Sequence, residues 1–171
     1  MTESTQQQNQ QPQQPDEGPE MPLPPAIYPL CIAGSALMLE KHLPIALPET
    51  LLTSTEFSAP ASYCTLLLAL GFMAWTIQVM RAHNTTLLPH RIANTLIDSG
   101  PFRFSRNPIY LGFSLLLLAV FFSNGNLWLL ILLPLNIGLL QHFVVLPEER
   151  NLSFLFDEDY KKYQNKVRRW L

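Results

Sequence analysis

Charged side chains are scarce in this chain. Asp, Glu, Lys and Arg make up 14% of its 171 residues, and the net charge is −2. Soluble domains carry about 25% charged residues, so the composition argues against an ordinary soluble domain. Without a basic excess, nothing suggests a nucleic-acid partner. The only two cysteines, Cys31 and Cys64, fall in apolar segments, which excludes a disulfide framework. We assign them no chemistry and expect no metal site.

Apolar residues are abundant instead, at 48% of the chain, and they gather in long runs. Runs that approach or reach bilayer-spanning length predict transmembrane helices. We therefore predict an all-α membrane protein of one domain, residues 26–171, with about four spans, at residues 26–45, 61–80, 109–122 and 127–146. The third run is short for a full crossing at about 1.5 Å per residue. The connection between the first two spans is predicted at Leu47–Pro60.

Both ends of the chain differ from this apolar region. Residues 1–25 are rich in Gln and Pro and have almost nothing to bury, so we predict a disordered tail. Residues 152–171 carry apolar side chains at steps of three and four, which predicts a C-terminal amphipathic helix. Its aromatic face could anchor at the lipid headgroups or cover a cytoplasmic pocket.

The distribution of arginine predicts the orientation in the membrane. Four arginines lie between Arg81 and Arg106, so this loop is expected to be cytoplasmic. With an even number of spans, both termini are then cytoplasmic in a multi-pass integral membrane protein. The turn and cap formers of the same loop predict irregular backbone there.

The stretch GPFRFSRNPIYLG, residues 100–112, concentrates charge, proline and glycine beside a span. Pro108 stands where a helix would begin, and such an end carries unpaired backbone N–H groups. With Arg103 and Arg106 nearby, it would suit a carboxylate or phosphate. The alternative is that these arginines only set the topology. A tight turn at Ser123–Asn126 makes the third and fourth spans a hairpin, which brings this stretch to Pro147–Arg150.

In order and spacing, these motifs resemble the membrane-integral methyltransferases related to isoprenylcysteine carboxyl methyltransferase and, more distantly, to phospholipid methyltransferases. The resemblance covers roughly residues 81–171. It rests on Pro89, on GPFRFSRNPIYLG, on Glu148-Glu149 followed by Leu152 and Phe156, and on Tyr160, Tyr163, Val167 and the closing Arg169-Trp170-Leu171. It implies S-adenosylmethionine as cofactor, enclosed by the cytoplasmic ends of the last two spans, and methyl transfer to a lipophilic carboxylate, amine or thiol acceptor.

Carried over residue by residue, the resemblance implies the cofactor-binding set Arg106, Asn107, Pro108, Tyr110, Gly112, His142, Glu148 and Glu149. Arg106, Glu149 and Arg169 are the implied catalytic residues. A guanidinium or a helix N-terminus suits the cofactor's carboxylate, and acidic side chains suit its ribose and ammonium groups. Gly112 would admit the ligand or a neighbouring helix. His142 could instead be a structural hydrogen-bonding residue.

Two residues depart from the family pattern. Asn107 stands where many relatives have histidine, so we expect no general base there, and Asp157 follows Phe156 where glycine is common. Two alternative functions stay open. One is an NADPH-dependent membrane steroid or sterol reductase, which adjacent glutamates disfavour because a phosphorylated ribose prefers Arg or Lys. The other is a non-catalytic membrane scaffold. The expected partners are the lipophilic substrate and membrane lipids, with no obligate protein partner.

Overall fold

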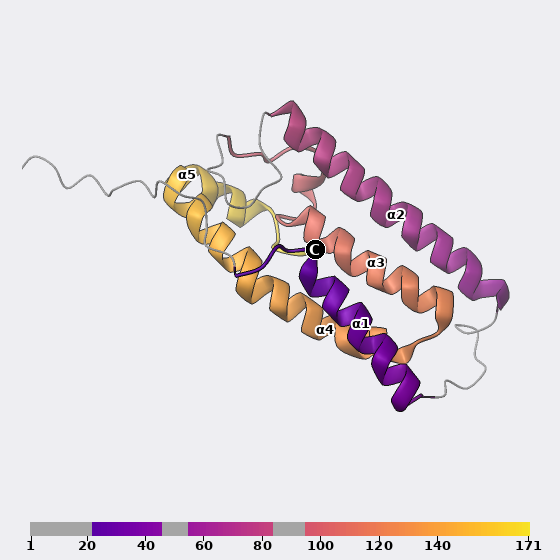
Figure 1. Ribbon diagram of the computed structural model, residues 1–171. Coiled ribbons are helices and arrows are strands. Elements are labelled where there is room, and N and C mark those ends of the chain that lie inside the picture. The colour runs from indigo at the N-terminus through magenta and orange to yellow at the C-terminus, as the bar shows by residue number, and fades with distance from the viewer. Residues whose placement is uncertain (1–21, 46–54, 84–94) are drawn as a thin grey trace, which may run out of the picture.

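A computed structural model describes residues 22–45, 55–83 and 95–171 (Figure 1). Helices hold 81% of these residues, and no strand occurs among them, so the predicted all-α class is confirmed. The elements in chain order are α1 (Ile27–His42), α2 (Thr55–Ala82), the 3₁₀ turn η1 (Gly100–Arg103), α3 (Pro108–Asn124), α4 (Leu127–Leu140), the π-helical segment η2 (Gln141–Val145) and α5 (Leu146–Lys166). Most of the predicted tail, residues 1–21, lies outside the described residues.

The helices pack around α3. Helix α2 lies along one side of α3, α4 lies along another, and α1 packs mainly on α4 (Figure 1). The core between α1, α3 and α4 is formed by apolar side chains, namely Ile32, Ala36, Leu117, Phe121 and Leu129. Because α3 and α4 are joined by a short turn, they run antiparallel, as the hairpin prediction requires.

The turn between α3 and α4 is built by Asn124, Gly125 and Asn126. Gly125 has φ +66°, a left-handed conformation that glycine adopts without a steric penalty and that commonly ends a helix. The Asn126 carboxamide oxygen caps α4 by accepting from the Trp128 backbone N–H at 2.9 Å. Its Nδ2 donates to the Ala36 carbonyl at 3.0 Å, which ties α1 to the same turn.

Within the described residues, two helical stretches are long and apolar enough to cross a membrane, Glu56–Ala82 and the continuous Leu127–Lys166. Helix α3 is apolar but shorter, and α1 has 16 residues. Length and composition thus support a membrane protein, while the count of four crossings stays a prediction.

Helix α2 contains the predicted second span, residues 61–80, and extends beyond it at both ends. Helix α2 begins at Thr55, so the last six residues of the predicted Leu47–Pro60 connection are helical. Pro60 lies inside the helix, where it removes one backbone hydrogen bond. The helix also continues through Arg81. Of the predicted irregular loop, residues 84–94 lie outside the described residues, and residues 95–107 contain only the short turn η1.

The predicted amphipathic helix at residues 152–171 also needs correction. Helix α5 begins at Leu146 and follows α4 through η2 without a break, since Pro147 occupies its first turn. It ends at Lys166, and Val167 is extended, with φ −124° and ψ 131°. Inside α5, Asp157 has φ +33° and ψ −105° and kinks the helix. A positive φ favours glycine, which is the residue that the family resemblance leads us to expect at this position.

Candidate functional site

The motif before α3 reaches its position through two backbone features. Gly100 has φ +59°, and a Cβ there would lie 2.9 Å from Val79 Cγ2 of α2. Glycine therefore permits both the turn and the close approach to α2. The chain then passes through η1 and enters α3 at Pro108, the first helical residue, as predicted. Arg106 is thereby placed next to the N-terminus of α3.

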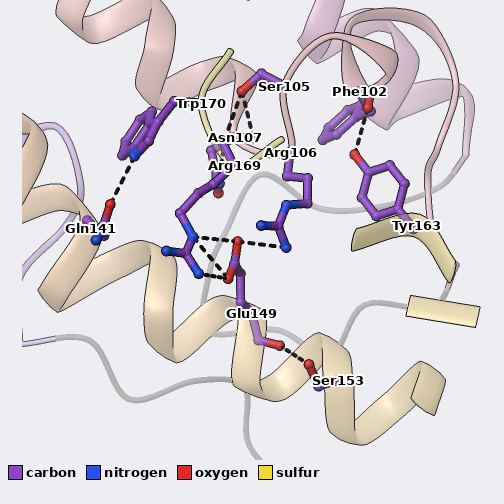
Figure 2. Close-up of polar contacts among 10 residues, drawn as sticks. All are labelled: Phe102, Ser105, Arg106, Asn107, Gln141, Glu149, Ser153, Tyr163, Arg169 and Trp170. Carbon is purple, nitrogen blue, oxygen red and sulfur yellow. Dashed lines mark hydrogen bonds and ion pairs between the residues drawn. The ribbon is translucent and has the colours of Figure 1, made fainter. Parts of the chain in front are cut away.

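At the centre of the site, the Glu149 carboxylate lies between two guanidinium groups (Figure 2). Arg169 donates from Nε to both carboxylate oxygens, at 3.1 and 3.2 Å, and from Nη2 to Oε2 at 2.8 Å. Arg106 Nη1 lies 3.3 Å from Oε1 on the other side. The Glu149 and Arg106 side chains are only 7% and 11% exposed, and that of Arg169 is 32% exposed. These ion pairs are therefore largely shielded from water, where charge interactions are strongest.

The last residues of the chain, Val167–Leu171, form a segment that we call the C-terminal strap. The Arg106 backbone N–H donates to the Arg168 carbonyl at 3.1 Å. The Arg169 carbonyl accepts two further bonds of 3.1 Å, from Ser105 Oγ and Asn107 Nδ2. At its end, Trp170 Nε1 donates to Gln141 Oε1 at 3.1 Å (Figure 2). The strap thus connects the start of α3 with the junction of α4 and α5, and it places Arg169 on Glu149.

The aromatic face of α5 packs on the protein. Tyr160, Tyr163 and Val167 form a buried cluster against Leu96 and Phe102. The Tyr163 hydroxyl donates to the Phe102 carbonyl at 2.7 Å (Figure 2). Of the two roles considered for this amphipathic segment, these contacts favour covering one end of the helices over anchoring in headgroups.

A second carboxylate, that of Glu148, has a different environment. Its Oε2 accepts a hydrogen bond of 3.0 Å from the Tyr110 hydroxyl. Glu148 is partly buried, and within the described residues it has no ion pair. One glutamate of the adjacent pair is therefore neutralised by arginines, while the other keeps a carboxylate that can accept from further donors.

Two nitrogens of the Arg106 guanidinium donate no hydrogen bond within the described residues. In the described part of the chain, Arg106 Nε and Nη1 are buried without a hydrogen-bond partner, although Nη1 makes the ion pair with Glu149. The Asn107 side chain bonds the strap and does not cap α3. Hydrogen bonds from Arg169 to Glu149 raise the pKa of the Arg169 guanidinium, so Arg169 stays protonated. Unused donors beside a helix N-terminus can bind an anionic group.

Seven of the predicted site residues come together here: Arg106, Asn107, Pro108, Tyr110, Glu148, Glu149 and Arg169. The carboxylate of Glu149 is already occupied by arginines, whereas an acidic side chain facing the cofactor was expected. Whether these side chains contact a cofactor stays a prediction.

Two predicted residues lie elsewhere. A Cβ on Gly112 would collide with the Met73 side chain, so this glycine admits the neighbouring helix α2, the second of its two predicted roles. His142 is exposed, and its ring contacts Phe143 with centroids 4.8 Å apart. The reason is η2, because an i→i+5 turn holds an extra residue and shifts the following side chains by roughly 100° around the axis. The α-helical spacing of seven residues between His142 and Glu149 therefore no longer places them on one face.

Sequence reasoning missed the roles of Ser105 and Gln141. Ser105 is fully buried; besides bonding the strap, its Oγ accepts from the Asn107 backbone N–H at 3.1 Å. Its place inside the GPFRFSRNP motif was a usable signal. Gln141 had none, because its partner Trp170 is 29 residues away and is reached only after the chain reverses at Val167.

A model of the phospholipid methyltransferase family matches residues 59–159, more than half of the chain. The matched range contains Arg106, Tyr110, Glu148 and Glu149, whereas α1 and the C-terminal strap lie outside it. No curated protein and no solved structure matches the chain.

Proposed function

The chain belongs to the phospholipid methyltransferase family, and we propose that it transfers a methyl group from S-adenosylmethionine to a lipophilic acceptor held in the membrane. Family membership implies methyltransferase activity on membrane lipid-like substrates. The cofactor, the acceptor chemistry and the residues of the site are our proposal. We take the acceptor to be a carboxylate, amine or thiol, as in enzymes that resemble isoprenylcysteine carboxyl methyltransferase.

One observation carries the proposal. The two guanidinium groups and two carboxylates gather at one end of apolar helices, beside the N-terminus of α3. A lipophilic acceptor can approach this end from the membrane, while a charged cofactor approaches it from the aqueous side. This arrangement also supports a cytoplasmic location for the site, with both termini on the same side of the membrane.

The donors and acceptors present fit S-adenosylmethionine. The buried and unpartnered Arg106 Nε would donate to its carboxylate, assisted by the backbone at Asn107 and Pro108. Glu148, which holds no arginine, would accept from its ribose hydroxyl or ammonium groups. Tyr110 is buried with its ring in the apolar core and would flank the nucleoside.

When bound, the cofactor supplies a methyl group on a sulfonium, which leaves as a neutral thioether when the acceptor's lone pair forms the new bond. The chain's own contribution is alignment. Arg169 fixes the Glu149 carboxylate, and Glu149 in turn holds the Arg106 guanidinium. The Glu149 and Arg106 side chains of these pairs are largely shielded from water. Alignment of two reactants can recover roughly 7 to 11 kcal/mol of a reaction barrier, so no general base is required at Asn107.

The test is equilibrium binding of S-adenosylmethionine, S-adenosylhomocysteine and NADPH to the detergent-purified protein. We expect both sulfur nucleotides to bind, and Arg106→Gln to weaken them at least tenfold. Arg103→Gln is the matched control, since Arg103 belongs to the same motif but is exposed. Binding of NADPH alone would support the reductase, and binding of none of the three would support the scaffold. Equal affinity of Arg106→Gln and wild type would remove Arg106 from the site.

A further inference from the structure

Helix α1 lies outside the residues that match the family, yet it is joined to the matched helices. The Ala36 carbonyl accepts from Asn126, and the Leu43 carbonyl accepts from Trp128 Nε1 at 2.9 Å. These bonds hold the far end of α1 to the turn between α3 and α4. Its first turn therefore has a fixed place near the candidate site, beside the C-terminus in Figure 1.

Tyr28, in that first turn, reaches the site's apolar side. It is 7% exposed and packs in a cluster with Tyr110, Leu140, Val144 and Val145. Its ring also stacks on Phe143, with centroids 6.0 Å apart and planes inclined by 10°. Tyr110 belongs to this cluster through its ring and to the polar site through its hydroxyl. The cluster thus adjoins the Glu148 carboxylate.

The Tyr28 hydroxyl is buried and has no hydrogen-bond partner among the described residues. Other buried tyrosines of the chain are satisfied: Tyr110 donates to Glu148, and Tyr163 donates to the Phe102 carbonyl. Burying a hydroxyl without a partner is costly and uncommon, so such a group calls for a partner outside the described residues, and a bound ligand is one. A tyrosine hydroxyl can both donate and accept, and it therefore suits a polar group of either kind.

We propose that Tyr28 is a substrate-contacting residue, supplied by α1, whose hydroxyl hydrogen-bonds the polar group of the lipophilic methyl acceptor. This inference rests on the proposed function. Tyr110 faces the proposed position of the nucleoside, but no buried member of the cluster carries a charge, so the rest of the cluster offers no ionic partner to the cofactor. They do offer an apolar wall for the acceptor's chain, with one hydroxyl for its polar end. Because α1 lies outside the family match, its contact would select among acceptors without changing the shared cofactor site.

The test compares wild type, Tyr28→Phe and the control Tyr63→Phe, which changes an exposed tyrosine of α2. Phenylalanine keeps the ring stacked on Phe143, and thermal unfolding checks that all three proteins are equally folded. Methyl transfer from labelled S-adenosylmethionine is measured with three acceptor probes: vesicles of phosphatidylethanolamine for an amine, S-farnesylcysteine for a carboxylate and hexadecanethiol for a thiol. We expect Tyr28→Phe to raise the acceptor KM roughly three- to tenfold, as the loss of one hydrogen bond predicts. The affinity for S-adenosylhomocysteine and the kcat should stay at the wild-type values.

An unchanged acceptor KM would overturn the role of Tyr28 while leaving the proposed function intact. Weaker binding of S-adenosylhomocysteine by Tyr28→Phe would also overturn it, because Tyr28 would then contact the cofactor. If wild type binds S-adenosylhomocysteine but methylates none of the probes, both the lipophilic acceptor and the contact with it are refuted. If wild type does not bind the nucleotide at all, the proposed function itself fails.

Discussion

Arg169, the third residue from the end of the chain, binds the Glu149 carboxylate through Nε and Nη2, the shortest contact being 2.8 Å. Twenty residues and a reversal of the backbone at Val167 separate the two side chains. On the opposite side of the same carboxylate, Arg106 Nη1 lies 3.3 Å from Oε1. Because Glu149 and Arg106 are both buried, each depends on the other to compensate the loss of hydration.

We expect Glu149→Gln to lower the free energy of unfolding in detergent by about 3 kcal/mol, because it leaves the buried Arg106 charge without its partner. Glu158→Gln is the control on the same helix, since the Glu158 side chain is 70% exposed and its ion pair with Lys161 contributes little. The double variant Arg106→Gln/Glu149→Gln should recover part of the loss. If Glu149→Gln were as mild as Glu158→Gln, the buried ion pair would not be the centre of this site.

The strap should contribute measurable stability through its tryptophan. Trp170→Phe removes the hydrogen bond to Gln141 and should cost about 1 kcal/mol. Binding of S-adenosylhomocysteine should weaken as well, because Arg169 is held by the same segment. Leu171→Ala, at a side chain that is 71% exposed, serves as control and should change neither quantity. Thermal unfolding and titration with S-adenosylhomocysteine are measured for wild type and both variants. If Trp170→Phe binds the nucleotide as tightly as wild type, the strap does not contribute to cofactor binding.

Gly112→Ala tests the packing of α3 on α2. The added Cβ would overlap the Met73 side chain at its Cγ, close to the backbone, so the helices must shift. We expect a destabilisation of about 1–3 kcal/mol, typical of overpacking. Gly71→Ala in α2 is the control: nothing lies within 4 Å of its Cβ position, so it should be neutral or stabilising by up to about 1 kcal/mol.

The combined variant Gly112→Ala/Met73→Ala separates packing from ligand binding. Removing the Met73 side chain should restore part of the stability that Gly112→Ala loses, as measured in a double-mutant cycle of unfolding free energies. Additive losses of unfolding free energy would show that the two residues are not in contact. Gly112 would then again be a candidate for contact with the cofactor.

Asp157→Gly should stabilise the protein. The φ of +33° at Asp157 is a strained conformation for a residue with a Cβ, and its relief should contribute about 1 kcal/mol even after the entropy cost of glycine. The ion pair from Lys161 to Asp157 is exposed, so its loss matters little. Asp159→Gly lies two residues on in regular helix, and it should instead cost about 0.5 kcal/mol. Equal signs for the two substitutions in denaturation experiments would contradict the strain at Asp157.

Local rules of the sequence explain the parts of this structure that were predicted well. Apolar runs predicted helices, Pro108 predicted the start of α3, and a short turn predicted an antiparallel hairpin that brings Arg106 to Glu149. Each of these depends on residues close together along the chain, where helix geometry and turn chemistry decide the outcome.

Long-range packing decided the rest. The π-helical turn η2 changes the helical register between His142 and Glu149. The Met73 side chain of α2 fills the space beside Gly112, so this glycine belongs to the interface between α2 and α3. The backbone leaves the helix at Val167, so that Arg169 and Trp170 reach Glu149 and Gln141. Tyr28 enters the site only because α1 packs on α4. The sequence by itself determined the helices, the turns and the charged end of the α3–α4 hairpin, because each of these depends on residues that are close together along the chain. Only the tertiary structure decided which distant side chains meet there, because that depends on how whole helices pack together.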